Sequence, residues 1–309
     1  MLCLQRSIRG AAAIFLAALL WGTTGTAAAF APELSPLAIG SLAMGIGGVL
    51  QGLMVTNMII SQRHLLIEQW RLLLAGAITV AIYPLAFYAS MRYAGVTVGT
   101  IISIGSAPLL SALIEYYFDG TRISRQWLCG ALIGVSGMIV LCLLKNTDSL
   151  YQQDRVILGI VLGLLAGATY AFYSWSARRL MQSGIAPRVA MGATFGSGGL
   201  LLFPVFFITA TAFFDHLTHV VVGLYMGLAP MFVGYLCYGY GLARLSASMA
   251  TTITLCEPVV AAILASLVIG ERLQLPAWIG AGMVVLSLFV IAFPVRRFSE
   301  HEQKQGETA

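Results

Sequence analysis

ILGIVLGLLAGATYAFYSWSA, the stretch from Ile157 to Ala177, contains no charged side chain in 21 consecutive positions. A helix rises about 1.5 Å per residue, so a helix of this length spans about 30 Å, the thickness of the hydrocarbon core of a bilayer. Lipid cannot hydrogen-bond to open backbone groups, and the stretch lacks the period-two alternation typical of a barrel strand. The sequence therefore predicts a transmembrane helix here.

Nine further apolar runs of similar length occur along the chain. They are predicted at Gly10–Phe30, Ala38–Met58, Leu72–Met91, Val98–Phe118, Trp127–Leu144, Val189–Ala210, Val220–Gly241, Met249–Ile269 and Pro276–Pro294. Hydrophobic residues make up 59% of the chain and charged residues only 9%, whereas soluble domains contain about 25% charged residues. Too few polar residues remain to cover a soluble surface, so the sequence predicts an all-α integral membrane protein with ten transmembrane helices.

The first run also has features of a signal peptide. Arg6 and Arg9 precede it, and Ala29-Phe30-Ala31 follows it in the manner of a cleavage site. The run is long for the apolar region of a signal peptide, so we expect it to be retained as the first transmembrane helix.

Basic residues fall mainly on one side of the predicted membrane. With the N-terminus inside, thirteen of the 17 Lys and Arg residues lie in inner connections, and only Arg92, Lys145, Arg155 and Arg272 lie outside. Cytoplasmic connections collect Lys and Arg during insertion, so we expect both chain ends on the cytoplasmic side of the cell (inner) membrane. This topology accounts for the net charge of +5, and no nucleic-acid partner is expected.

The chain contains an internal repeat. A shift of 150 residues, without a gap, superposes identical residues in a helix, its turn and the next helix: Pro108 with Pro258, Ala112 with Ala262, Gly120 with Gly270, Arg122 with Arg272, Gly130 with Gly280 and Ala131 with Ala281. The halves 1–148 and 149–296 each contain five predicted crossings, and an odd number inserts the second half upside down. The sequence predicts two inverted five-helix repeats, an architecture found in transporters, followed by a polar cytoplasmic tail at 297–309.

Short motifs carry a resemblance to a known family. They are Leu20-Trp21-Gly22 in the first run, Cys256-Glu257-Pro258 in the ninth, and Gly270-Glu271-Arg272-Leu273 before Pro276 and Ile279-Gly280-Ala281 in the tenth. Over essentially its whole length the chain resembles the drug/metabolite transporter superfamily, EamA type. The resemblance implies an exporter in which helices one to four and six to nine surround a central cavity, with the fifth and tenth outside.

The first half departs from the family pattern. Ser106-Ala107-Pro108 stands where a Glu would precede Pro, and Asp119-Gly120-Thr121 stands where Gly-Glu would be typical. The Glu before Pro and the Glu after Gly occur in the second half, as Glu257 and Glu271, and any role they have is therefore expected in that half only.

Glu257 is the leading candidate for a functional group. It lies about nine residues into its apolar run, near the bilayer midplane, where an ionisable side chain is costly and is a functional candidate by default. It could exchange a proton or pair with a substrate ammonium group. A structural role in the turn that Pro258 distorts is an equal alternative. Glu115, nearer the inner end of its run and close to Arg122 and Arg125, is expected to act as an anchor.

Aromatic and hydroxyl residues supply the other candidate substrate-binding groups. They are Trp21 and Thr24 in the first run, Tyr170 and Tyr173 in the sixth, and Tyr235 and Tyr238 in the eighth. A spacing of three places each pair on one helical face, although such stripes also pack between helices without binding a ligand. As a set facing one cavity they would suit a small, partly apolar, neutral or zwitterionic solute.

Pro108 and Pro258 occupy equivalent places in the two halves. We expect both to kink their helices and to leave polar backbone facing a cavity, although kinks that only improve packing are an alternative. Glycines spaced four apart allow close helix approach, for packing or for dimerisation, so either a monomer or a homodimer is expected. The series are Gly48 and Gly52, Gly130 and Gly134, and Gly159, Gly163 and Gly167.

No catalytic, metal or cofactor site is predicted. The five cysteines are scattered without a CxxC pair. His216 and His219 lie beside Asp215 in one short connection, which rarely binds a metal tightly. There is no HExxH, no GxSxG with a membrane His, no pair of intramembrane aspartates and no Walker motif.

The sequence therefore predicts a secondary carrier of a small-molecule substrate in the lipid bilayer, working by alternating access, with the proton as a candidate coupling ion. The expected solutes are amino acids, related metabolites or drugs, and the family resemblance implies that they are exported. The alternatives are a multi-span membrane enzyme, an accessory subunit without transport activity, and a channel. The inverted repeat favours the carrier, because an enzyme has no need of one.

Overall fold

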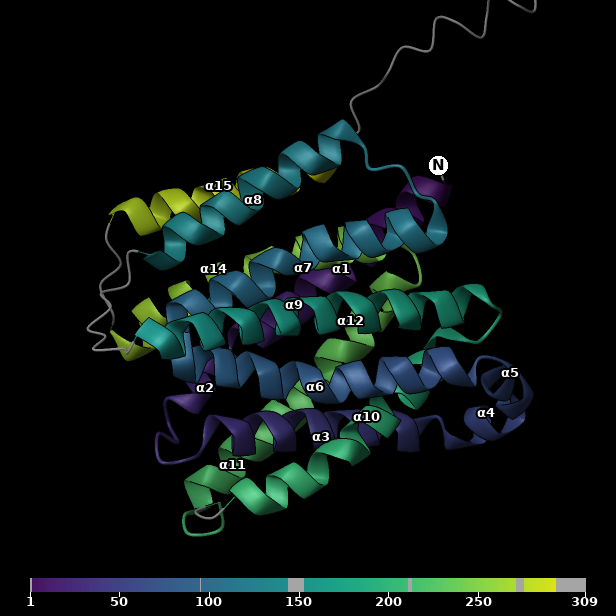
Figure 1. Ribbon diagram of the computed structural model, residues 1–309, viewed down its shortest axis with the longest axis horizontal. Helices are drawn as coiled ribbons and strands as arrows, with labels where there is room; N and C mark the ends of the chain where they lie inside the picture. The colour runs from purple at the N-terminus through teal and green to yellow at the C-terminus, as the bar shows by residue number, and fades with distance from the viewer. Residues whose placement is uncertain (1, 95, 144–152, 211–212, 271–274, 293–309) are drawn as a thin grey trace, which may run out of the picture.

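The computed structural model describes residues 2–94, 96–143, 153–210, 213–270 and 275–292, and all regular secondary structure in these ranges is helical. The longer helices lie side by side in one bundle (Figure 1). The first half contains α1 (Leu2–Gly22), α2 (Thr24–Ala28), α3 (Pro36–Met54), α4 (Thr56–Ser61), α5 (Arg63–Glu68), α6 (Trp70–Ala94), α7 (Val96–Asp119) and α8 (Arg125–Leu143).

The second half contains several interrupted helices. Its elements are α9 (Gln153–Gln182), α10 (Pro187–Thr209), α11 (Leu217–Met226), the π-helical turn η1 (Gly227–Val233), α12 (Gly234–Leu242), α13 (Ala247–Ile253), the 3₁₀ turn η2 (Thr254–Cys256), α14 (Glu257–Leu264), the π-helical turn η3 (Ala265–Ile269) and α15 (Leu275–Ala292). Pro36 and Pro187 begin α3 and α10, at a position where the missing amide hydrogen would have no intrahelical partner.

Eight segments in the described part of the chain are long and apolar enough to cross a membrane. They are Gln5–Ala28, Pro36–Met54, Trp70–Ala94, Val98–Asp119, Arg155–Gln182, Pro187–Thr209, Leu217–Leu242 and Ala247–Val268. Two shorter apolar helices, Arg125–Val140 and Leu275–Ile291, coincide with the fifth and tenth predicted runs. The chain is a multi-pass helical membrane protein.

Glycines set the closest helix contacts. A Cβ at Gly52 of α3 would lie 3.2 Å from the carbonyl oxygen of Gly192 of α10. A Cβ at Gly163 of α9 would lie 2.8 Å from Ser90 Oγ of α6. Small residues at such points allow two backbones to approach. The glycine series noted in the sequence are therefore used for packing inside the chain.

Contacts between pairs of helices organise the bundle. The pairs include α3 with α10, α6 with α9, α8 with α15, α7 with α9, α1 with α12, and α7 with α13. The pair α8 and α15 lies along one edge of the bundle (Figure 1), and a Cβ at Gly134 of α8 would lie 2.7 Å from Ser287 Oγ of α15. The other pairs form the body of the molecule.

Two membrane segments of the second half are interrupted near their middles. The eighth predicted run changes from α11 to the π-helical turn η1, which contains Pro230, and then to α12. The ninth changes from α13 to the 3₁₀ turn η2 and restarts as α14 at Glu257. Both interruptions replace the regular i to i−4 hydrogen bonds over a few residues, and both lie beside the cavity described next.

Candidate functional site

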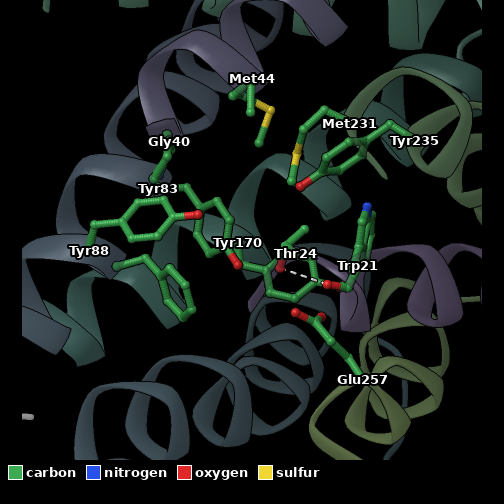
Figure 2. A pocket seen from close by; sticks show the side chains of 13 residues that line it. Trp21, Thr24, Gly40, Met44, Tyr83, Tyr88, Tyr170, Met231, Tyr235 and Glu257 are labelled. Atoms are coloured by element: carbon green, nitrogen blue, oxygen red, sulfur yellow. Dashed lines mark hydrogen bonds between the residues drawn. The ribbon is translucent and has the colours of Figure 1, made fainter. Parts of the chain in front are cut away.

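A cavity lies between the two halves of the chain. It encloses about 510 Å³ of empty space, including its opening to solvent. The residues that line it come from α1, α2, α3 and α6 of the first half and from α9, η1, α12 and α14 of the second. They are Trp21, Thr24, Gly40, Ala43, Met44, Tyr83, Pro84, Phe87, Tyr88, Tyr170, Met231, Tyr235 and Glu257 (Figure 2).

Trp21 is held rigidly at the wall of this cavity. Its side chain is 5% exposed, and its indole Nε1 donates a hydrogen bond of 2.9 Å to the carbonyl oxygen of Pro230 in the π-helical turn. The next residue, Gly22, allows α1 to reach α14, because a Cβ there would lie 3.0 Å from the carbonyl oxygen of Glu257. The Trp21-Gly22 pair of the first run therefore has a structural explanation: Trp21 bonds to the π-helical turn, and Gly22 leaves room for α14.

The four predicted tyrosines form one cluster, but only two of them reach the cavity. Tyr170 and Tyr235 line it, whereas Tyr173 and Tyr238 are fully buried beside them. The hydroxyls of Tyr173 and Tyr235 share a hydrogen bond of 3.0 Å. The Tyr238 hydroxyl lies 2.8 Å from Ser174 Oγ. Tyr173 and Tyr238 are thus placed to support the two tyrosines that line the cavity.

Thr24 lines the cavity as the first residue of α2. Its hydroxyl donates a hydrogen bond of 2.7 Å to the carbonyl oxygen of Trp21. The prediction that Trp21 and Thr24 share one face is consistent with this geometry, since both side chains point to the same cavity (Figure 2).

Sequence reasoning missed the contribution of α6. Tyr83, Phe87 and Tyr88 line the cavity, and the Tyr83 ring lies 5.4 Å from the ring of Tyr170, centroid to centroid. Their third run contains no aromatic pair with the spacing of three that marked the other runs. Two signals were present in the sequence: Tyr83 and Phe87 are four residues apart and so lie on one helical face, and Pro84 lies inside α6 and in the lining.

Glu257 carries the only carboxylate among the thirteen lining residues, all of which lie in the described part of the chain. The 3₁₀ turn η2 places it at the start of α14, and Figure 2 shows its carboxylate directed into the cavity on the side of Trp21 and Thr24. Within the described ranges no basic side chain forms an ion pair with it. Its carboxyl group is therefore directed at whatever occupies the cavity.

The two repeat-related prolines lie in different surroundings. Pro258 follows the interruption of the ninth segment and is buried. Pro108 lies inside α7, which continues as one helix from Val96 to Asp119. Neither proline lines the cavity.

Glu115 acts as an anchor, as expected, but its partners are not arginines. The residue is buried, with 4% of its surface exposed. It accepts hydrogen bonds from the backbone amide of Ala247 at 2.6 Å and from the hydroxyl of Ser248. These groups belong to the first turn of α13, where backbone amides lack intrahelical partners. Glu115 of the first half therefore caps a helix of the second half.

Asp119, at the end of α7, makes a second link to the other half. It accepts a hydrogen bond of 2.9 Å from the indole of Trp175, and it forms an ion pair of 3.0 Å with Arg179. Both partners lie in the last turns of α9. The ends of α7 and α9 and the start of α13 are thus fastened together, away from the cavity lining.

The histidine cluster noted in the sequence meets an acidic residue that the sequence did not suggest. Nε2 of His216 and Nε2 of His219 lie 3.7 Å and 3.9 Å from Glu33 Oε2. Among the described residues no group of three or more His, Cys, Asp and Glu side chains is arranged to hold a metal ion.

Comparison with known proteins connects this architecture to a family. The sequence model of the EamA-like transporter family matches residues 8–143 and, a second time, residues 157–293. An uncharacterized transporter of Bacillus subtilis (strain 168), YwfM, is 30% identical over 298 residues, covering 96% of each chain. A probable amino-acid metabolite efflux pump of Escherichia coli (strain K12) is 24% identical over 236 residues, covering 73% of this chain and 77% of that protein.

A crystal structure of a protein superposes on this chain with a TM-score of 0.75 at 18% identity, covering 91% of this chain and 96% of that one. At this identity the superposition shows a shared fold. The family match covers most of both halves, and the relative at 30% identity extends over nearly the whole length. The chain belongs to the EamA-like transporter family and is a membrane transporter.

Proposed function

We propose that this protein is a secondary transporter that exports small organic solutes by alternating access, with amino acids, related metabolites or drugs as the solutes. The observation that carries the proposal is the cavity that both halves line, with one carboxylate directed into it. Midplane sites at the interface of two repeats are typical of such carriers. The name of the Escherichia coli relative, an amino-acid metabolite efflux pump, supports the direction and the solute class.

We propose that ten helices cross the membrane as two inverted repeats, 1–148 and 149–296, with both chain ends in the cytoplasm. The double family match supports this division. Gly120 and Gly270, which the 150-residue shift pairs, both adopt positive φ angles, +65° and +81°. Reporter fusions at each chain end should both report the cytoplasmic side. Ends on opposite sides would exclude inverted five-helix halves.

The helix pairing also supports a two-fold relation between the halves. The second crossings pair with each other (α3 with α10), as do the fourth (α7 with α13) and the fifth (α8 with α15). Exchange of the halves turns the third crossing into the eighth and the sixth into the first. The contact of α6 with α9 therefore corresponds to the contact of α1 with α12, and both are present. This is the pattern expected when an axis in the membrane plane exchanges the halves.

Under this topology the structure is closed on the cytoplasmic side. Thr24, Gly40 and Tyr88 of the cavity lining belong to the outer halves of their segments. The links of Glu115 and Asp119 join the inner ends of α7, α9 and α13. Inward opening must separate these ends, which makes the links the inner closure of the transport cycle.

We propose Glu257 as the group that couples transport to protons. A carboxylate that faces the cavity without a basic partner can hold either a proton or a cationic solute group, so the two compete for one site. Such competition converts a proton gradient into solute export. No cofactor takes part in this scheme.

The test begins with a tolerance screen of overproducing cells, which identifies a solute, and continues with that solute in proteoliposomes. Glu257→Gln should abolish solute movement driven by a pH gradient, because the amide cannot release a proton, while protein abundance stays unchanged. Glu68→Gln, at an exposed carboxylate in α5, is the matched control and should keep full transport. Full pH-driven transport in Glu257→Gln would reject the coupling role.

A carrier differs from a channel and from a non-transporting subunit in one measurable property. Solute loaded inside proteoliposomes should accelerate uptake of labelled solute from outside. The unlabelled solute carries the binding site back to the outer side, where it can bind the labelled solute again. Flux without this acceleration would favour a channel, and no flux of any tested solute would favour an enzyme or an accessory subunit.

A further inference from the structure

We infer that the cavity selects a solute by a cationic amine on an apolar or aromatic body and disfavours a free carboxylate. The inference rests on the proposed transport function and specifies its substrate class. Among the proposed solutes it favours amines and disfavours amino acids with a free carboxyl group, because a zwitterion would bring a carboxylate into the cavity along with its amine.

The charges of the lining carry the first part of the argument. Glu257 carries the one carboxyl group that the lining offers, and Lys, Arg and His are absent from the thirteen lining residues, all of them described. A solute ammonium would pair with Glu257. A solute carboxylate would be confined near a like charge without any cation to compensate it.

Two basic residues near the end of α9 are already engaged. Arg179 is paired with Asp119, and Arg178 donates to the carbonyl oxygen of Leu242. The N-terminal end of α14, whose helix dipole would attract an anion, carries Glu257 itself in its first turn. None of these groups is offered to a solute carboxylate.

Two of the five hydroxyl groups in the lining, those of Thr24 and Tyr170, already donate to acceptors within the protein. Thr24 uses its single hydroxyl hydrogen on the carbonyl oxygen of Trp21. Thr254 donates to the carbonyl oxygen of Thr251, so in its 2.9 Å contact with Tyr170 the tyrosine must be the donor. Neither Thr24 nor Tyr170 therefore has a hydrogen left to donate to a solute carboxylate.

Aromatic faces complete a site that suits a cation. The ring centroids of Trp21 and Tyr235 are 4.7 Å apart, and those of Tyr83 and Phe87 are 5.8 Å apart. All four side chains line the cavity that contains the carboxylate. The negative faces of aromatic rings attract ammonium groups, most strongly where water is excluded. The same rings offer apolar surface to the body of the solute.

A matched series of probes separates amine recognition from carboxylate recognition. Phenylalanine carries both groups, phenylalaninamide keeps the amine and loses the negative charge, phenethylamine lacks the carboxyl group, and N-acetylphenylalaninamide lacks the cation. Binding to the purified protein is measured by calorimetry. The amide and the amine should bind at least about tenfold more tightly than phenylalanine, a difference of about 1.4 kcal/mol, and the N-acetyl compound should bind no better than phenylalanine.

Two variants link any preference to this cavity. Glu257→Gln should remove the preference for the amine over the N-acetyl compound, whereas Glu68→Gln should retain it. Tyr83→Leu removes one ring and leaves the carboxylate, so it should weaken binding of phenethylamine while the order of the series stays the same. If Glu257→Gln fails to fold, the loss of affinity in Tyr83→Leu remains a test of the aromatic site.

The outcomes distinguish this inference from the proposed function. Phenylalanine binding as tightly as its amide would overturn the inference, and so would failure of both amines to bind. Transport of phenylalanine in proteoliposomes alongside either result would leave the carrier function standing. Conversely, tight binding of the amines without transport of phenethyltrimethylammonium, a permanent cation that does not cross lipid unaided, would support the inference and count against the carrier.

Discussion

Glu115 and Glu257 are both acidic residues in apolar helices, yet their surroundings give them different roles. Glu257 faces a cavity and has no basic partner among the described residues. Glu115 is buried and accepts hydrogen bonds from the start of α13. The sequence around each carboxylate is similarly apolar. The difference arises from partners 132 and 133 residues away in the chain.

At the residue scale we predict that Glu115→Ala lowers the free energy of unfolding by about 2 kcal/mol, because it leaves buried amides of α13 without an acceptor. Glu115→Gln keeps one acceptor oxygen and should cost about half as much. Thermal unfolding in detergent measures both. The exposed Glu68→Ala is the control, and a Glu115→Ala protein as stable as this control would refute the capping role.

At the scale of elements, interrupted helices and glycine contacts position the site. The turn η1 supplies the carbonyl oxygen that holds Trp21, and η2 precedes the restart of the helix at Glu257. Close packing of α3 against α10 fixes the two second crossings against each other. An irregular backbone is tolerated within a membrane where it is buried in protein or lines a cavity, which is the case for both turns.

The α3–α10 contact leads to a prediction about Gly199. A Cβ at Gly199 would lie 2.9 Å from the carbonyl oxygen of Gly45, so Gly199→Ala must push the two backbones apart and should cost about 2 kcal/mol of stability. A Cβ at Gly282 of α15 would meet no atom within 4 Å, so Gly282→Ala should leave the unfolding temperature nearly unchanged. Equal unfolding temperatures for the two variants would contradict this account of the packing.

At the scale of the whole molecule, the cavity lies toward the proposed outer side of the membrane, and hydrogen bonds and an ion pair hold the helix ends together on the proposed inner side. Asp119 contributes two of the inner links, to Trp175 and to Arg179. By the repeat alignment its counterpart is Ile269, which has no carboxylate. The repeat-related position therefore cannot make an equivalent carboxylate link, and the equilibrium between the two orientations should depend on Asp119.

This dependence is measurable by cysteine labelling from the cytoplasmic side. In a protein lacking its five native cysteines, a cysteine at the fully buried Thr251 should react slowly with an impermeant maleimide. Adding Asp119→Ala should speed the reaction about fivefold, the effect of a shift of about 1 kcal/mol in the equilibrium. Adding Glu68→Ala instead should have no effect. An unchanged rate with Asp119→Ala would show that these links do not hold the inner end closed.

The sequence by itself determined that the protein is a multi-pass helical membrane transporter of the EamA-like family. Run length, charge distribution and short motifs are local properties, and each is readable without knowing any contact. The same local reading identified Trp21, Thr24, Tyr170, Tyr235 and Glu257, which the cavity brings together. It also included Tyr173 and Tyr238, since spacing on one helix cannot distinguish the lining from the layer behind it.

Only the tertiary structure decided which side chains share a cavity and which acidic residue is committed to a helix cap. The hydrogen bond from Trp21 to Pro230 joins residues 209 positions apart, and the contribution of Tyr83 and Tyr88 depends on how α6 packs against the second half. Such contacts depend on how the two halves fit together. No window of sequence contains that information, because membrane insertion selects each helix for its apolar length whatever its later neighbours are.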